Sequence, residues 1–453
     1  MSNLVENLLE NALFLAAAVD KPAARSLNVL EAAEVFLEAG LNSRGEEILA
    51  GALTVIETIK LPSERVTRLA WAAALYARAG NIRYAHQVFE RAILLARAVS
   101  DEEKIKALAD IAGEYSDVEF RDEGLPLLAE LENLVPGMQS EAEKSHQFTL
   151  LADLYAEFEQ VDKAKALLES SLRSSRSIRD NWFKAERTVE AAESYSQLRE
   201  EEKSAAALQE AWQISQRIEP ANRPYFLFGI LDIYLDLGVR IRVLELLTEL
   251  RGIIEQDPST FSRAGGLIEL AERYHEAGLD DQALEFLAAA RETAEKAESD
   301  SDRVTGFTRA AALLGRLGRT PEALELAEKA FLLCGNLKNE RTHIYLLGDI
   351  SLVFLELDAR GETARCVMRI LEIVAASEVR TLGLGEIAGE LAEGGQIALA
   401  VRLAGNIREA EVKSGALCTI ASALVSLGRE PDEEIELAVR EMSDGTSSQR
   451  GLF

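Results

Sequence analysis

A tyrosine recurs every 39 or 40 residues between residues 76 and 274 of this 453-residue chain. The series consists of Tyr76, Tyr115, Tyr155, Tyr195, Tyr234 and Tyr274, and Phe36 extends it backwards by another 40 residues. A period of roughly 20 to 50 residues is typical of an array whose units bury their apolar faces only by stacking on one another. Since the period crosses every position where a domain boundary could fall, we expect one elongated array.

A basic residue follows the same rhythm eleven residues ahead of the aromatic position, and it continues less regularly towards the C-terminus. We call this series the basic ladder, and its members are Arg25, Arg65, Lys104, Lys144, Lys184, Arg223, Arg263, Arg303, Arg341, Arg380 and Lys413. At about 100° per residue, such a position lies only ~20° from the aromatic, on the buried side of a helix. A row of cations could hold an anionic polymer, but this azimuth favours a structural role, with each side chain satisfying carbonyls or a carboxylate of the preceding hairpin.

Residues 65–103 show what one unit contains. Leu69, Ala72, Ala73 and Tyr76 have spacings of three and four, which place them on one face of a helix. Gly80 then breaks this pattern as a left-handed C-terminal turn would, and a second amphipathic run follows. The unit is therefore predicted to be a helical hairpin. The break recurs at Gly40, Gly80, Gly238, Gly278, Gly318, Gly395 and Gly428.

The sequence thus predicts an all-α fold of about eleven helix-turn-helix repeats of about 40 residues over residues 25–440. The hairpins are expected to start near residues 25, 65, 104, 144, 184, 223, 263, 303, 341, 380 and 413. We expect residues 1–24 to form a capping helix and residues 441–453 to form a flexible tail. We expect no proline in the middle of a helix.

The order of small and large apolar residues in these hairpins resembles that of tetratricopeptide repeats. The matching positions are Ala72, Ala73, Tyr76, Gly80, Ala85, Phe89 and Ala92 in one unit, and Leu270, Ala271, Tyr274, Gly278, Ala283, Leu287 and Ala290 in another. The family repeat is usually about 34 residues long, which is shorter than the units of this chain. The resemblance implies a right-handed α-solenoid, whose first helices line a concave groove that receives a peptide or a partner helix.

Acidic residues are predicted to line this groove. The residue two positions before the aromatic lies about 160° from it, on the exposed side of the first helix. The candidate binding residues at this position are Glu34, Asp153, Glu193, Asp232 and Glu272. They could attract a basic protein segment, or they could be an ordinary solvated face on a chain whose net charge is −28.

Other classes of function find little support in the sequence. The excess of acid disfavours nucleic acid as a partner. The chain contains no H-E-x-x-H, Walker, G-x-S-x-G or dinucleotide-binding motif, so we expect no enzyme, no catalytic residue and no cofactor. Three Glu-x-x-His pairs have the spacing found in di-metal helical bundles, but they belong to hairpins at least two apart, and we predict no metal site. These pairs are Glu143 with His146, Glu272 with His275, and Glu340 with His343.

The setting and the partners are predicted only in outline. Cys334, Cys366 and Cys418 form no C-x-x-C pair, and a reducing cytoplasm is the expected location. The N-terminal apolar run Ala12–Val19 is too short to span a bilayer, so no membrane insertion is expected. The leading hypothesis is a non-catalytic scaffold that binds a basic or amphipathic protein segment in an acidic groove. The alternative is a regulatory sensor that responds to a peptide or a small ligand. Exposed ends of the array would also permit homo-oligomers.

Overall fold

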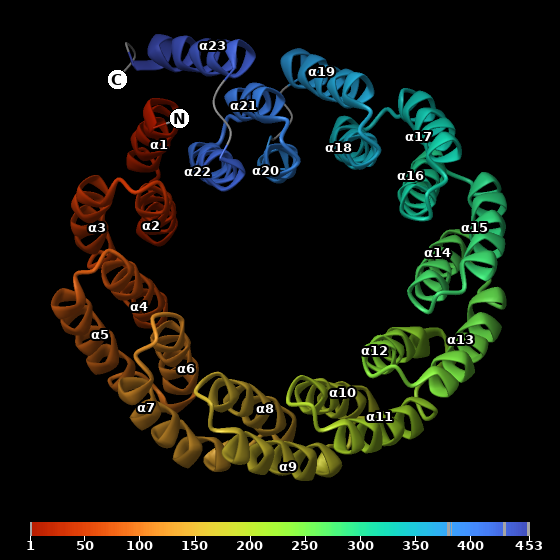
Figure 1. Cartoon of the computed structure of the whole chain (residues 1–453), viewed down its shortest axis with the longest axis horizontal. Coiled ribbons are helices and arrows are strands. Elements are labelled where there is room, and N and C mark those ends of the chain that lie inside the picture. Colours follow the sequence, from red (N-terminus) through yellow and green to blue (C-terminus); the bar gives the residue numbers. More distant parts are fainter. Residues whose placement is uncertain (1, 378–380, 382, 429–431, 451–453) are drawn as a thin grey trace. The chain divides into compact units, whose positions relative to one another are not determined.

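The computed structural model describes residues 2–377, 381, 383–428 and 432–450 of the chain. This described part is built of α-helices and two short 3-10 helices and contains no β-strand (Figure 1). The prediction of an all-α array of hairpins is confirmed.

After α1 (Ser2–Ala17), the helices alternate between the first and the second member of a hairpin, which we call A and B helices. The hairpins are α2 (Pro22–Glu38) with α3 (Asn42–Ile56), α4 (Pro62–Arg78) with α5 (Ile82–Arg97), α6 (Asp101–Asp117) with α7 (Arg121–Leu134), α8 (Glu141–Glu157) with α9 (Val161–Ser177), α10 (Asn181–Gln197) with α11 (Glu201–Ser215), α12 (Arg223–Asp236) with α13 (Arg240–Glu255), α14 (Thr260–Glu276) with α15 (Asp280–Glu295), α16 (Asp300–Arg316) with α17 (Thr320–Cys334), α18 (Glu340–Glu356) with α19 (Arg360–Ala376), α20 (Leu384–Glu393) with α21 (Ile397–Gly405), and α22 (Ala410–Leu427) with α23 (Glu433–Arg450). The 3-10 helices are Val135–Gly137 and Pro220–Asn222.

The repeated aromatic is tied to the turn that ends its helix. Asn81 N donates to Tyr76 O at 2.9 Å, and Glu200 N donates to Tyr195 O at 2.9 Å. This bond reaches back five residues across a left-handed residue, as in the Schellman motif that closes many helices. The side chain of Tyr76 is buried beneath the same turn. The constant distance between aromatic and glycine therefore follows from the geometry of the turn.

All seven glycines predicted to end a helix have a positive φ angle: Gly40, Gly80, Gly238, Gly278, Gly318, Gly395 and Gly428. In the other four hairpins the left-handed residue is not glycine: Glu119, Glu159, Arg199 and Asp358 have φ between 53° and 62°. The left-handed conformation costs a residue with a Cβ atom about 1–2 kcal/mol.

Replacing Glu119 by glycine is therefore expected to raise the free energy of unfolding by about 1 kcal/mol. This value is the strain removed less the conformational entropy that a glycine loses on folding. Glu119 is exposed and its φ is 62°, so the change acts on backbone strain. Urea unfolding followed by circular dichroism measures it.

The matched control is Gly80→Ala. A Cβ atom at Gly80 meets no atom within 4 Å, but φ there is 84°, so this change is expected to lower the free energy of unfolding by about 1 kcal/mol. A Glu119→Gly chain no more stable than its parent would contradict the assignment of strain.

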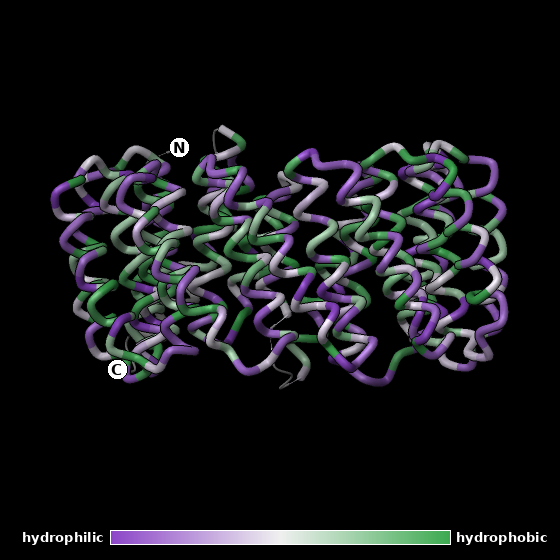
Figure 2. Tube along the Cα trace, turned by 90° about the horizontal axis from the view of Figure 1, so that it is seen from below, coloured by the Kyte–Doolittle hydropathy of each residue, from purple (hydrophilic) through white to green (hydrophobic). Residues whose placement is uncertain are grey.

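The contacts between helices divide the chain into two compact units. Unit 1 joins Met1–Leu95 with Glu298–Phe453, and unit 2 is Ala96–Ala297. Within each unit the A helices form one layer and the B helices a second layer (Figure 1). Apolar and polar residues alternate along the helices (Figure 2). The apolar side chains meet between the two layers, where Ala72, Ala73, Phe89 and Ala92 are fully buried.

Unit 1 brings the two ends of the sequence together. α1 packs against α2 and against α22, where Ser414 Oγ donates to Ala12 O at 2.8 Å. Asn28 Nδ2 on α2 donates to Glu411 O on α22 at 2.7 Å. α1 therefore covers the first hairpin, as was expected for residues 1–24, and it also packs against α22, which was not expected. The first and last hairpins thus contact each other within unit 1, and homo-oligomerisation through the ends of the array stays a prediction.

The reason for this packing lies in the composition of α22. By length and composition it is apolar enough to cross a membrane, but half of it is buried inside the protein. Ala416, Leu417, Ile420, Ala421 and Leu424 are all buried. Apolar residues on several sides of one helix require cover from several neighbours, and α1 and α2 supply part of that cover.

Two local expectations differ from the structure. Pro126 lies inside α7, where it removes one backbone hydrogen bond without ending the helix. α23 continues to Arg450, so most of the stretch 441–453 that was expected to be a flexible tail is helical, and residues 451–453 lie outside the described residues. Ile435, Ala438, Val439 and Met442 on this helix are buried, which explains why it docks.

Candidate functional site

Four of the predicted acidic residues lie on successive A helices of unit 2: Asp153 on α8, Glu193 on α10, Asp232 on α12 and Glu272 on α14. We call the side of α6, α8, α10, α12 and α14 that points away from the B helices the A-face of unit 2. Glu193 is exposed, whereas the other three are partly buried. The carboxylates thus lie on the side of the helices that was predicted, with different degrees of exposure, and their role in binding stays a prediction.

An arginine pairs with two of these carboxylates. Arg273 Nε lies 2.8 Å from Asp232 Oδ1 and Nη2 lies 3.1 Å from Oδ2, while Nη1 lies 3.5 Å from Glu272 Oε2. The fifth predicted residue, Glu34 in unit 1, likewise pairs with Arg78 of the next A helix. The sequence held a signal for both pairs, because acid and arginine are separated by one repeat plus one or four residues.

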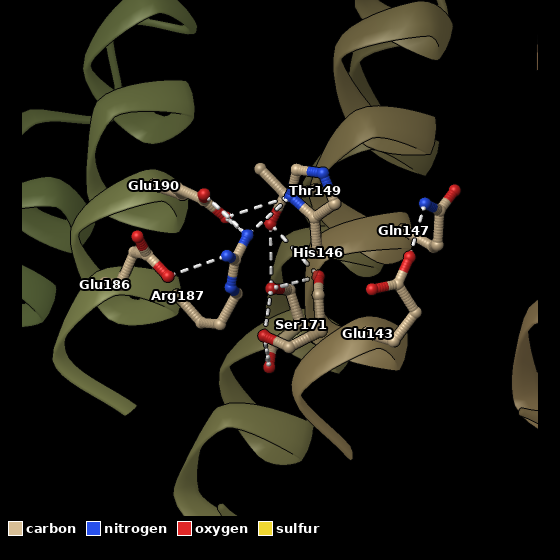
Figure 3. A network of polar contacts seen from close by, with 9 residues as sticks. Glu143, His146, Gln147, Thr149, Ser171, Glu186, Arg187 and Glu190 are labelled. Carbon is tan, nitrogen blue, oxygen red and sulfur yellow. Dashed lines mark hydrogen bonds and ion pairs between the residues drawn. The ribbon is translucent and has the colours of Figure 1, made fainter. Parts of the chain in front are cut away.

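A second arginine joins α8 and α10 (Figure 3). Arg187 Nη1 donates to Glu190 Oε1 at 2.6 Å and to His146 Nδ1 at 2.7 Å, and its Nη2 donates to Glu186 Oε2 at 2.7 Å. His146 is thus held in a polar network between two helices. Among the described residues no group of three or more His, Cys, Asp or Glu side chains could hold a metal ion.

A buried hydroxyl cluster fixes α8 on α9 beneath this network. Ser145 Oγ donates to Ser171 O at 3.0 Å, and Thr149 Oγ1 lies 2.8 Å from Ser171 Oγ (Figure 3). All three side chains are buried and bonded, as buried polar groups must be. The cluster gives the A-face a rigid support.

Acid remains in excess on the A-face around Asp153. Burial raises the pKa of Asp153, a hydrogen bond with Ser194 opposes the shift, and the charges of Glu193 and Glu190 raise the pKa further. Burial also raises the pKa of Glu157 on α8, and the charge of Asp117 on α6 adds to it. Carboxylates that repel one another in this way would be stabilised by a cation placed between them.

Exposed aromatic side chains stand at the N-terminal ends of three A helices of unit 2. Phe183 is 49% exposed, Tyr225 61% and Phe261 50%, and we call these three the aromatic edge. Tyr225 and Phe261 lie about 180° and 140° around their helices from the buried tyrosine, on the same side as the carboxylates. None of these three residues was predicted, although the same calculation of helical angles places Tyr225 and Phe261 on this side.

Members of the basic ladder lie at the joints between hairpins. Four of them donate to carbonyls at the end of the preceding hairpin or helix: Arg25 to Val19 at 2.8 Å, Arg223 to Ile218 at 3.0 Å, Arg263 to Asp257 at 2.7 Å and Lys413 to Gly405 at 2.8 Å. Three others pair with a carboxylate in the first turn of their own helix: Lys104, Lys144 and Arg303. Arg65 Nε is buried without a hydrogen-bond partner, and Arg380 lies outside the described residues. At seven positions of the basic ladder the cation thus contacts a carbonyl or a carboxylate near a joint between hairpins, and a structural role for the whole ladder stays a prediction.

The α18 hairpin departs from the basic ladder. Its fourth residue, where α8 has Lys144, is His343, and Arg341 is therefore out of register. His343 is buried, its Nε2 has no partner, and burial lowers its pKa. A neutral histidine thus takes the place of the cation at this joint.

The cysteines are poor candidates for nucleophiles. Burial raises the pKa of the Cys334 and Cys366 thiols to about 12, and it raises the pKa of Cys418 as well. Since the thiolate is the reactive form, these side chains stay unreactive near neutral pH.

No protein-family model matches this chain, and no curated protein matches it. Among solved structures, a kinesin light chain from Podosopora anserina with nearly identical TPR-like repeats is 19% identical, and the match covers 53% of this chain and 100% of that one with a TM-score of 0.27. The apo form of the quorum sensor NprR from B. thuringiensis is 14% identical, covering 78% of this chain and 97% of its own, with a TM-score of 0.29. A Rap protein complexed with Competence and Sporulation Factor is 13% identical, covering 77% and 97%, with a TM-score of 0.29.

At these TM-scores the matches carry no argument about function. The hairpins are similar to tetratricopeptide repeats (TPR-like). They pack small residues between A and B helices and repeat a left-handed turn.

Proposed function

We propose that this chain is a non-catalytic scaffold that binds a basic or amphipathic protein segment along the A-face of unit 2. The observation that carries the proposal is the surplus of carboxylates around Asp153, on the same side of the A helices as the exposed Tyr225 and Phe261. The cytoplasmic location expected from the cysteines belongs to this proposal.

The carboxylates and the exposed aromatic residues of the A-face would contribute to binding in different ways. A lysine or arginine of the partner placed near Asp153 and Glu193 would relieve the repulsion between these carboxylates. Exposed tyrosine and phenylalanine side chains offer large contact areas at little entropic cost, and such residues dominate many interfaces. Asp232 and Glu272 contribute less in this scheme, because Arg273 already pairs with them.

The alternative is a regulatory sensor that responds to a peptide or a small ligand. One observation favours it, namely a large cavity in unit 1. The residues that line this cavity all belong to unit 1 and none belongs to the A-face of unit 2, so the two functions can be tested separately.

The test compares four tagged chains in a pull-down from a lysate of the source organism. The acid variant carries Asp153→Asn with Glu193→Gln, and the aromatic variant carries Tyr225→Ser with Phe261→Ser. The control variant carries Ile241→Ser with Glu202→Gln, which change an exposed apolar and an exposed acidic residue on B helices of the same unit.

A partner retained by the parent and by the control but lost from both other variants would support the proposal. The purified partner should then bind each of the two variants about tenfold more weakly than the parent. Its affinity should also fall with salt, because exposed charges are screened beyond about 10 Å at 0.1 M ionic strength. Identical sets of partners from all four chains would exclude the A-face as the binding surface.

A further inference from the structure

Unit 1 contains a cavity of about 1270 Å³ between α1, α19, α21, α22 and α23. Most of its wall is apolar and includes Phe14, Leu371, Ile407 and Met442. Small-molecule sites usually measure roughly 300–1000 Å³, so this cavity is large enough for an extended ligand.

The charged residues of the wall are mainly basic. Arg402, Arg408 and Lys413 line the cavity, against a single carboxylate, Glu441, among the described lining residues. The whole chain has a net charge of −28, so a basic wall is a local exception. This reversal of sign indicates a preference for an anion.

Lys413 is buried without a carboxylate partner among the described residues. Its side chain is only 7% exposed, and Nζ donates to Gly405 O at 2.8 Å. No carboxylate of the described residues lies within ion-pair distance of this ammonium group, whereas Lys104 and Lys144 pair with carboxylates at 2.9 and 2.8 Å. The C-terminal carbonyl of α21 compensates the charge only in part, because an ammonium group has three N–H donors. A buried charge without a counter-charge is costly, and an anion in the cavity would remove that cost.

The arginines of the wall have capacity to bind as well. Arg402 lies 3.7 Å from Glu434 and 3.9 Å from Glu441, which is beyond hydrogen-bonding distance. Arg408 Nη2 donates to Val374 O and Ser377 O at 2.9 and 2.7 Å, so this side chain is held in place by backbone carbonyls. Arg402 is therefore the second cation that can turn its donors towards an anionic group.

We propose that this cavity binds a small amphiphile with an apolar body and one anionic head group. The head pairs with Lys413 and Arg402, and the body lies against Phe14, Leu371 and Met442. Because α1 and α23 both contribute to the wall, an occupant would hold the N-terminal and C-terminal helices of unit 1 together. The site shares no residue with the A-face of unit 2, so either proposal can fail alone.

The test uses the fluorescent probe 1-anilinonaphthalene-8-sulfonate, an apolar molecule with one anionic group, on the full chain. Decanoate and its uncharged analogue decanamide compete for the probe. Decanoate should displace it at a concentration about tenfold lower than decanamide does, as expected for hydrogen bonds to a charged group.

Three variants locate the interaction. Lys413→Met keeps the length of the side chain and should abolish the preference for decanoate without lowering the temperature of thermal unfolding. Arg402→Gln should also reduce the preference for decanoate, and Arg402 is more exposed than Lys413. If the Lys413→Met chain does not fold, the Arg402→Gln chain provides the test. Leu371→Trp adds bulk to the wall where the apolar body is proposed to lie and should weaken the binding of probe, decanoate and decanamide together.

Equal displacement by decanoate and decanamide in the parent chain would overturn the proposal. So would a preference for decanoate that survives both charge-removing variants. Unchanged binding of the probe to the Leu371→Trp chain would show that its apolar part does not lie against Leu371, which also overturns the proposal.

Discussion

Replacing Tyr155 by alanine should lower the free energy of unfolding of unit 2 by about 3–5 kcal/mol, the usual cost of removing a buried aromatic ring. The side chain has no exposed surface, and its hydroxyl donates to Glu132 Oε2 at 3.0 Å. Lys163 Nζ lies 4.8 Å from the centre of the ring, so the change also removes a cation–π contact. Urea unfolding followed by circular dichroism measures the loss.

Tyr155→Phe is the matched control, because it keeps the ring and removes only the hydroxyl group. We expect a loss of about 1 kcal/mol, the net worth of one hydrogen bond. If alanine and phenylalanine cost the same, the repeated tyrosine is present for its hydroxyl group, and the explanation of the repeat by packing is wrong.

Leu8→Ala should have a comparable effect in unit 1, with a loss of about 2–5 kcal/mol. Leu8 is fully buried on α1, which packs against both α2 and α22. Hydrogen exchange measured by mass spectrometry should become faster in α1 and α22 and stay unchanged in α8 to α11, which belong to unit 2.

The control on the same helix is Glu6→Ala, because Glu6 is exposed and its replacement should change stability by less than about 0.5 kcal/mol. Unaltered exchange in α22 of the Leu8→Ala chain would mean that α1 does not support that helix in solution.

The sequence predicts the hairpins well because their signals are local. The apolar spacing indicates the helical period, and a glycine after the A helix of seven hairpins indicates a left-handed residue. The left-handed residues Glu119, Glu159, Arg199 and Asp358 could not be predicted in this way, because they are not glycine. Nothing in the sequence distinguishes them from residues with an ordinary backbone conformation.

The contacts of unit 1 could not be predicted in the same way. Ser414 and Ala12 are 402 residues apart, and nothing in either repeat specifies the other. The cavity beside Lys413 depends on this packing, so its residues carry no sequence signal. On the A-face of unit 2, the helical period predicted the positions of the carboxylates. The pairing of Asp232 with Arg273 was not predicted, although their separation by one repeat plus one residue was a signal for it.

The contact between α1 and α22 also has a consequence for synthesis on the ribosome. Unit 2 is one continuous stretch of chain and can complete its contacts as soon as residue 297 has emerged. α1 must wait for Ser414, and at about 5–20 residues per second the intervening chain takes roughly 20–80 s to make. During that time the apolar side of α1, with Leu8 and Leu9, has no partner from α22. α1 is thus made before unit 2 but is fully packed only after α22 has emerged.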